Sequence, residues 1–152
     1  MDVPTDAMRL SYVLDSALPS VDKAEQAARE MAGKSGFDEE TCGLIALAVR
    51  EATVNAILHG NRYDPAKNVT LSLESTPERL TIAVRDEGPG LDPAKLPDPL
   101  APENFLKSSG RGIYLIRAFM DEVSFPPVAS GTEISMTKFL RPPASRESEN
   151  QA

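Results

Sequence analysis

Three polar side chains interrupt an apolar stretch of the sequence at steps of four residues. Glu51, Asn55 and His59 lie within and just after the run from Leu44 to Leu58, where most other residues are aliphatic. Residues four apart share one helix face, and apolar residues on nearly every other side predict a largely buried helix. A buried carboxylate or amide without partners is costly. We therefore expect this polar stripe to face a polar cavity, and its partner could be a ligand.

A second candidate site is the segment DEGPG at 86–90. Asp86 continues the parity of the inward-facing residues before it, so a carboxylate is expected at an inward position. Gly88 and Gly90 allow a backbone turn and the close approach of a ligand. An ordinary Asp-Gly turn would look the same, and the segment lacks the oxygen-bearing positions of a calcium-binding EF-hand loop. Alone, it predicts either a binding turn or a plain one.

A third candidate is the segment SGRG at 109–112, which opens a helical pattern. The free amides and the positive dipole end of a helix N-terminus suit a phosphate, and Arg111 could add a charge-assisted contact. The segment fits neither a Rossmann fingerprint nor a Walker A loop. A flexible loop end capped by glycine is the plainer interpretation.

Three helices are expected to position these residues. The first covers 20–34 with Ser20 as its N-cap, and the second covers 38–60 with Asp38 as its N-cap and carries the polar stripe. The third is a short helix at 112–120, where apolar residues recur at helical spacing.

Five segments with strand-like patterns accompany the helices. They are 8–14, 69–73, 80–86, 122–125 and 132–140. The first reads as an edge strand with alternate residues half-buried, the second and third as an antiparallel hairpin, and the last two as strands that close the sheet.

Composition limits the classes of protein that fit. The chain has 152 residues, 41% of them hydrophobic, and a net charge of -7, which predicts one domain at 1–140 and argues against coating nucleic acid or an anionic membrane. The region 88–110 holds five prolines and is expected to be a functional lid or disordered, while 141–152 reads as a disordered tail. The sequence shows no apolar run near 18 residues and no signal-peptide pattern. Its single cysteine, Cys42, is expected in the core, and the predicted location is therefore the cytoplasm.

The three candidate sites, taken in this order and spacing, resemble the nucleotide-binding boxes of the Bergerat-fold ATPases, the superfamily of DNA gyrase, MutL and histidine kinases. The resemblance covers about residues 8–140, and EATVNAILHGN, DEGPG and GRGIYLIRAFMDEV are most similar to the small serine kinases that act as anti-sigma factors. It implies an α+β two-layer sandwich: a mixed, mostly antiparallel sheet of about five strands, covered on one face by three helices. The ATP lid would lie at about 91–110.

The resemblance also implies roles at the phosphate end of the site. Asn55 matches the asparagine that coordinates Mg²⁺, an ion that takes a few oxygen ligands and keeps several waters. Glu51 matches the acidic residue that activates the attacking hydroxyl. His59 and Asn61 lie in the same box with only a supporting role, and as the single histidine His59 cannot form a multi-histidine metal site.

At the other end, Asp86 matches the aspartate that accepts a hydrogen bond from the adenine amino group. Gly88 and Gly90 would let the chain pass close to the base. The hinge and phosphate-binding end of the lid are implied at four consecutive positions: Gly110, Arg111, Gly112 and Ile113.

The implied activity is ATP-dependent phosphorylation of a serine or threonine on a STAS-type anti-anti-sigma protein, together with sequestration of a sigma factor. Two alternatives stay open: an ATP-gated binding module without catalysis, and a detached histidine-kinase-type domain that phosphorylates histidine on another protein. A homodimer that uses the edge strand near Tyr12 is a further hypothesis, by analogy with relatives.

Overall fold

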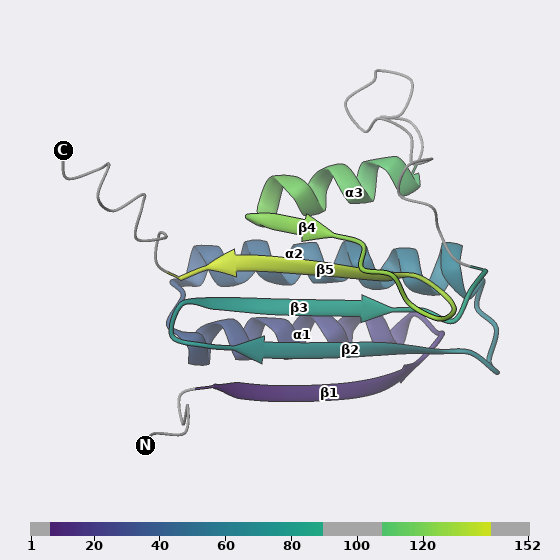
Figure 1. Cartoon of the computed structure of the whole chain (residues 1–152), viewed down its shortest axis with the longest axis horizontal. Coiled ribbons are helices and arrows are strands. Elements are labelled where there is room, and N and C mark those ends of the chain that lie inside the picture. Colours follow the sequence, from purple (N-terminus) through teal and green to yellow (C-terminus); the bar gives the residue numbers. More distant parts are fainter. Residues whose placement is uncertain (1–6, 90–107, 141–152) are drawn as a thin grey trace.

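The computed structural model describes residues 7–89 and 108–140. They form one five-stranded sheet in the order β1-β2-β3-β5-β4, with helices on one face (Figure 1). The strands are β1 (Met8–Asp15), β2 (Asn68–Ser75), β3 (Arg79–Arg85), β4 (Glu122–Ser124) and β5 (Glu133–Phe139). The helices are α1 (Pro19–Ser35), α2 (Glu39–Asn55), which continues as the π-helical turn η1 (Ala56–Gly60), and α3 (Ser108–Phe119).

This architecture confirms the expected α+β sandwich with five strands and three helices. Every pairing between described strands is antiparallel, so the mixed character expected for the sheet is not found among them. The predicted lid falls mostly, and the tail at 141–152 entirely, outside the described residues.

The core forms between the helices and the covered face of the sheet. Alternate residues of β2 and β3 are buried, among them Leu71, Leu73, Leu80 and Ile82, each at most 1% exposed. This period of two arises because successive strand side chains point to opposite faces. The same parity carries Asp86 inward, where it is 6% exposed, so the predicted inward carboxylate is confirmed.

The helix starts test two predicted caps. Asp38 caps α2 as expected, accepting a hydrogen bond from the Thr41 amide at 2.7 Å. The prediction of Ser20 as the N-cap of α1 is wrong: Pro19 is the first helical residue and Ser20 is buried in the first turn. Proline suits that position because its φ is already helical and the amide it lacks would have no partner there.

Strand β1 lies at the edge of the sheet, as predicted, but is less buried than its pattern indicated. Leu14 is buried, whereas Leu10 and Tyr12 are 44% and 38% exposed. The reason is that α1 packs over β2 and β3, leaving the outer part of the edge strand uncovered.

The segment Glu39–Gly60, which comprises α2 and η1, is the one described helix long and apolar enough to cross a membrane, by length and composition alone. Half of its apolar window is buried inside the domain, and the helix packs against both α1 and α3. Its apolar surface is therefore explained by its place in the core.

Candidate functional site

Glu51 and Asn55 lie one turn apart on α2, half-buried, and α3 passes directly over them. A Cβ atom at Gly112 of α3 would lie 2.9 Å from Asn55 Nδ2 and 3.4 Å from Glu51 Oε1. A side chain at this position would force the Asn55 side chain to shift. The side chains of Glu51 and Asn55 form no hydrogen bond with another residue that the structure describes. The structure thus places the polar stripe and the 109–112 segment together.

The start of α3 differs from the expected one. The helix begins at Ser108, so Gly110, Arg111, Gly112 and Ile113 lie within its first two turns and not ahead of it. The first four amides of an α-helix, from the N-cap to the third helical residue, lack intrahelical acceptors, which among the described residues assigns the free amides to 108–110. Gly112 therefore contributes space beside α2, not a free amide. Arg111 is exposed at the same end.

A π-helical turn ends the stripe-bearing helix and alters the expected position of His59. The Asn61 amide donates to the Ala56 carbonyl at 2.8 Å, a bond to the fifth residue back. Such a turn is wider than an α turn, so the step from Asn55 to His59 does not continue the regular stripe. His59 is exposed, while Glu51 and Asn55 remain half-buried.

Asp86 follows β3 and is held by backbone amides from two sides. Its Oδ1 accepts from the Gly88 amide at 2.9 Å and from the Thr132 amide at 3.1 Å, and its own amide donates to the Thr132 carbonyl at 2.9 Å. Burial raises the pKa of the Asp86 carboxyl, against the opposing effect of those two amides and of the Lys67 charge. No residue within 7–89 and 108–140 donates to Oδ2.

Three glycines make room around Asp86. A Cβ atom at Gly60 would collide with the Asp86 carboxylate, one at Gly88 with the Gly60 carbonyl, and one at Gly131 with the Asp86 carbonyl. Gly131 also has a φ of 78°, a conformation that favours glycine. Gly60 ends the helix predicted at 38–60, and Gly131 directly precedes the strand predicted at 132–140. Only the fold shows that both border Asp86, Gly60 at its carboxylate and Gly131 at its backbone carbonyl.

The candidate sites therefore line up along one helix. Glu51 and Asn55 meet α3, while Gly60, nine residues after Glu51, meets Asp86 and Gly88. At 1.5 Å of rise per residue, these two ends are roughly 13 Å apart along the axis, a span that suits an elongated ligand with chemically different ends. Gly90 lies outside the described residues.

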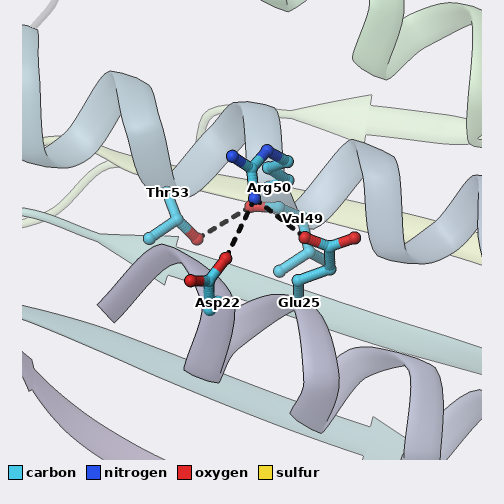
Figure 2. A network of polar contacts seen from close by, with 5 residues as sticks. All are labelled: Asp22, Glu25, Val49, Arg50 and Thr53. Atoms are coloured by element: carbon cyan, nitrogen blue, oxygen red, sulfur yellow. Dashed lines mark hydrogen bonds and ion pairs between the residues drawn. The ribbon is translucent and has the colours of Figure 1, made fainter. Parts of the chain in front are cut away.

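Arg50, the neighbour of Glu51, fixes α2 against α1 (Figure 2). Its guanidinium lies 2.9 Å from Glu25 and 3.3 Å from Asp22, both on α1. Hydrogen bonds to Glu25 and Asp22 raise the pKa of Arg50 above its ordinary value. Thr53, on the next turn, donates to the Val49 carbonyl at 2.7 Å. The Thr53 bond stays within α2, whereas the two Arg50 ion pairs join α1 to the helix that carries Glu51 and Asn55.

Comparison with known proteins adds three findings. The family model for the histidine kinase-like ATPase domain matches residues 14–138. A serine-protein kinase RsbW from Bacillus licheniformis is 34% identical over 116 residues, covering 72% of each chain. An anti-sigma F factor from Bacillus cytotoxicus is 39% identical over 101 residues, covering 63% of this chain and 68% of its own.

Solved structures agree on the fold. A Mycobacterium tuberculosis protein with RsbU and RsbW domains matches 89% of this chain at 20% identity, with a TM-score of 0.63. This chain spans about a third of that protein. A histidine kinase domain from Erythrobacter litoralis matches 80% of this chain at 21% identity, with a TM-score of 0.51.

Proposed function

This chain belongs to the histidine kinase-like ATPase family, in its group of serine-protein kinases and anti-sigma factors, and we propose how its site binds ATP and which protein it phosphorylates. ATP lies along the α2–η1 helix, with adenine at Asp86 and the phosphates at Asn55 and Glu51. The phosphoryl group goes to a serine or threonine of a STAS-type anti-anti-sigma protein. The observation that carries the proposal is the alignment of an enclosed carboxylate and an unpartnered Glu–Asn pair along one helix.

At the adenine end, the ionised Asp86 accepts a hydrogen bond from the exocyclic amino group of the base. Its Oδ1 already takes two backbone amides, so Oδ2, beside Gly60, receives the base. The absence of side chains at Gly60 and Gly88 lets the chain pack closely around this carboxylate. A purine with a carbonyl oxygen at that position would oppose the carboxylate, and this repulsion selects adenine over guanine.

At the phosphate end, Asn55 fits a magnesium ion. Its amide oxygen is the kind of ligand that Mg²⁺ accepts, and one protein ligand suffices where phosphates and waters supply the rest. When bound, the ion neutralises charge on the phosphates. Within 7–89 and 108–140, no group of three acidic, histidine or cysteine side chains is placed to hold a metal ion by itself.

Glu51 acts as the general base. Its carboxylate accepts the proton of the acceptor hydroxyl while that oxygen bonds to the γ-phosphorus and the bond between the γ-phosphorus and the bridging oxygen breaks, leaving ADP. The amino-terminal end of α3 faces the same place with its unpaired amides and Arg111, which favours anionic phosphates.

The partners follow from the same proposal. The chain sequesters a sigma factor in the cytoplasm when the STAS protein is phosphorylated, because a new dianion at a packed interface disfavours rebinding. The relatives' names, which include both a serine-protein kinase and an anti-sigma factor, support this pair of roles.

The test is to incubate the purified protein with Mg²⁺, ATP labelled on the γ-phosphate and candidate STAS proteins. Acid-stable label on a STAS serine or threonine is expected, and label should be absent with Glu51→Gln. Acid-labile label would instead indicate transfer to histidine, and ATP binding without any label would indicate a binding module.

A further inference from the structure

Asn61, the residue after η1, is buried, and both polar atoms of its side-chain amide form hydrogen bonds. It is 1% exposed. Its Nδ2 donates to Ser16 Oγ at 2.8 Å and to the Asn68 carbonyl at 3.0 Å, and its Oδ1 accepts from the Glu87 amide at 2.8 Å. The partners settle which end of the amide is oxygen, because the Glu87 amide can only donate and the Asn68 carbonyl can only accept.

These bonds converge on the residue that follows Asp86. The Glu87 amide is held by Asn61, and the Glu87 carboxylate accepts from the Asn68 amide. Glu87 is therefore fixed through both its backbone and its side chain. Ser16, the other partner of Asn61, donates to the Lys67 carbonyl, so the network also joins the end of β1 to the segment before β2.

The Asp86 carboxylate depends on this anchoring. Asp86 is held on one side by the strand-like pairing with Thr132 and on the other by the turn in which the Gly88 amide reaches back to Oδ1. Glu87 is the middle residue of that turn, and its amide is the one that Asn61 binds. If the Glu87 amide lost its acceptor, the turn would be free to relax and Oδ2 would lose its fixed direction.

We propose that Asn61 is a positioning residue for adenine recognition: through the Oδ1 bond to the Glu87 amide it holds the turn that aims Asp86 at the base. The inference rests on the proposed function, since it concerns the adenine end of the same site. Asn61 itself does not contact the base. The two Nδ2 bonds, to Ser16 and Asn68, orient the amide and stabilise the fold.

Two substitutions at Asn61 separate positioning from stability. Asn61→Ala removes all three bonds. Asn61→Asp keeps an oxygen for the Glu87 amide, removes the two donations and places a second carboxylate oxygen against the Asn68 carbonyl, which lowers stability. Ser16→Ala is the matched control, because it removes one partner of Nδ2 and leaves the bond to Glu87 in place.

The experiment is calorimetric titration of the wild type and the three variants with ATP and with GTP, in Mg²⁺, alongside thermal melting. We expect Asn61→Ala to bind ATP about tenfold more weakly, equivalent to about 1.4 kcal/mol, while GTP binding changes little, so that the preference for ATP falls. Asn61→Asp and Ser16→Ala should bind ATP within about threefold of the wild type, although both melt at lower temperature.

Any of three results would overturn the role of Asn61 in adenine recognition. They are an unchanged ATP affinity in Asn61→Ala, an equal loss of ATP and GTP affinity in that variant, and equally weakened ATP binding in Asn61→Asp and Asn61→Ala. If Asn61→Ala does not fold, Asn61→Asp decides, because its retained oxygen must preserve ATP binding. A wild type that does not bind ATP would count against the proposed function, whereas a wild type that binds normally beside an unaffected Asn61→Ala counts only against Asn61.

Discussion

Replacing Asp86 by asparagine should weaken ATP binding and at the same time stabilise the nucleotide-free protein, which then no longer buries an ionised carboxylate. Asparagine keeps an oxygen that can accept from the Gly88 and Thr132 amides as Asp86 Oδ1 does. The group beside Gly60 becomes an NH₂, which is a donor and opposes the adenine amino group. The substitution therefore preserves the fold contacts and reverses the one contact made with the base.

The magnitudes follow from those contacts. A hydrogen bond to a charged group contributes about 1.5–3 kcal/mol, so the dissociation constant for ATP should rise roughly 10- to 150-fold. Stability should move the other way. Burial raises the pKa of Asp86 above the ordinary 3.8, so the ionised carboxylate destabilises the free protein at neutral pH. That cost is absent below pH 3.8 and develops as the pH rises through the folded-state pKa.

Calorimetry tests the predicted loss of ATP affinity, and thermal melting tests the predicted change in stability. The matched control is Glu78→Gln, at an exposed residue in the distant β2–β3 turn. At neutral pH Asp86→Asn should melt at or above the wild-type temperature and bind ATP weakly, and wild-type affinity should fall on acidification as Asp86 takes up a proton. Unchanged ATP affinity would refute the adenine role. A clearly lower melting temperature at neutral pH would refute the argument from burial.

Three further experiments test the rest of the site and the helix that carries it. Glu51→Gln should bind ATP within about twofold of the wild type and lose phosphoryl transfer in the labelling assay; retained transfer would remove Glu51 as the base. Gly112→Ala should melt close to the wild type, because a gain of about 1 kcal/mol in helix propensity offsets the crowding, but it should lose phosphoryl transfer because Asn55 is displaced. Its control, Gly33→Ala, has nothing within 4 Å of the new Cβ and should keep activity. Equal activity of the two variants would contradict the role of Gly112. A double-mutant cycle between Arg50 and Glu25 should give a coupling of about 0.2–1 kcal/mol that weakens with salt, and zero coupling at low salt would show that the ion pair does not orient α2.

Much of the fold was readable from the sequence because it depends on local patterns. Period-two alternation located β2 and β3 and carried Asp86 to an inward position, and the Asp38 cap needed only a side chain three residues before a free amide. Where local signals compete, the prediction is wrong: Ser20 has a side chain that could cap, but Pro19 before it already starts the helix.

The arrangement of the site was less accessible. Gly60, Gly88 and Gly131 are far apart in the chain, and their shared packing around Asp86 is a tertiary contact that no spacing reveals. The π turn at Ala56–Gly60 is similarly hidden, since the apolar pattern runs through it unchanged. A four-residue period therefore placed His59 with Glu51 and Asn55, whereas the wider turn separates it.

The central claim, that the α2–η1 helix carries an adenine-selective site for magnesium and a triphosphate, is tested most directly by one set of calorimetric titrations. Wild-type protein is titrated with ATP and GTP, each with and without Mg²⁺. We predict one ATP per chain, tighter binding with Mg²⁺, and GTP at least about tenfold weaker. Equal affinity for the two nucleotides, or ATP binding that is indifferent to Mg²⁺, would contradict the placement of adenine at Asp86 and of the metal at Asn55.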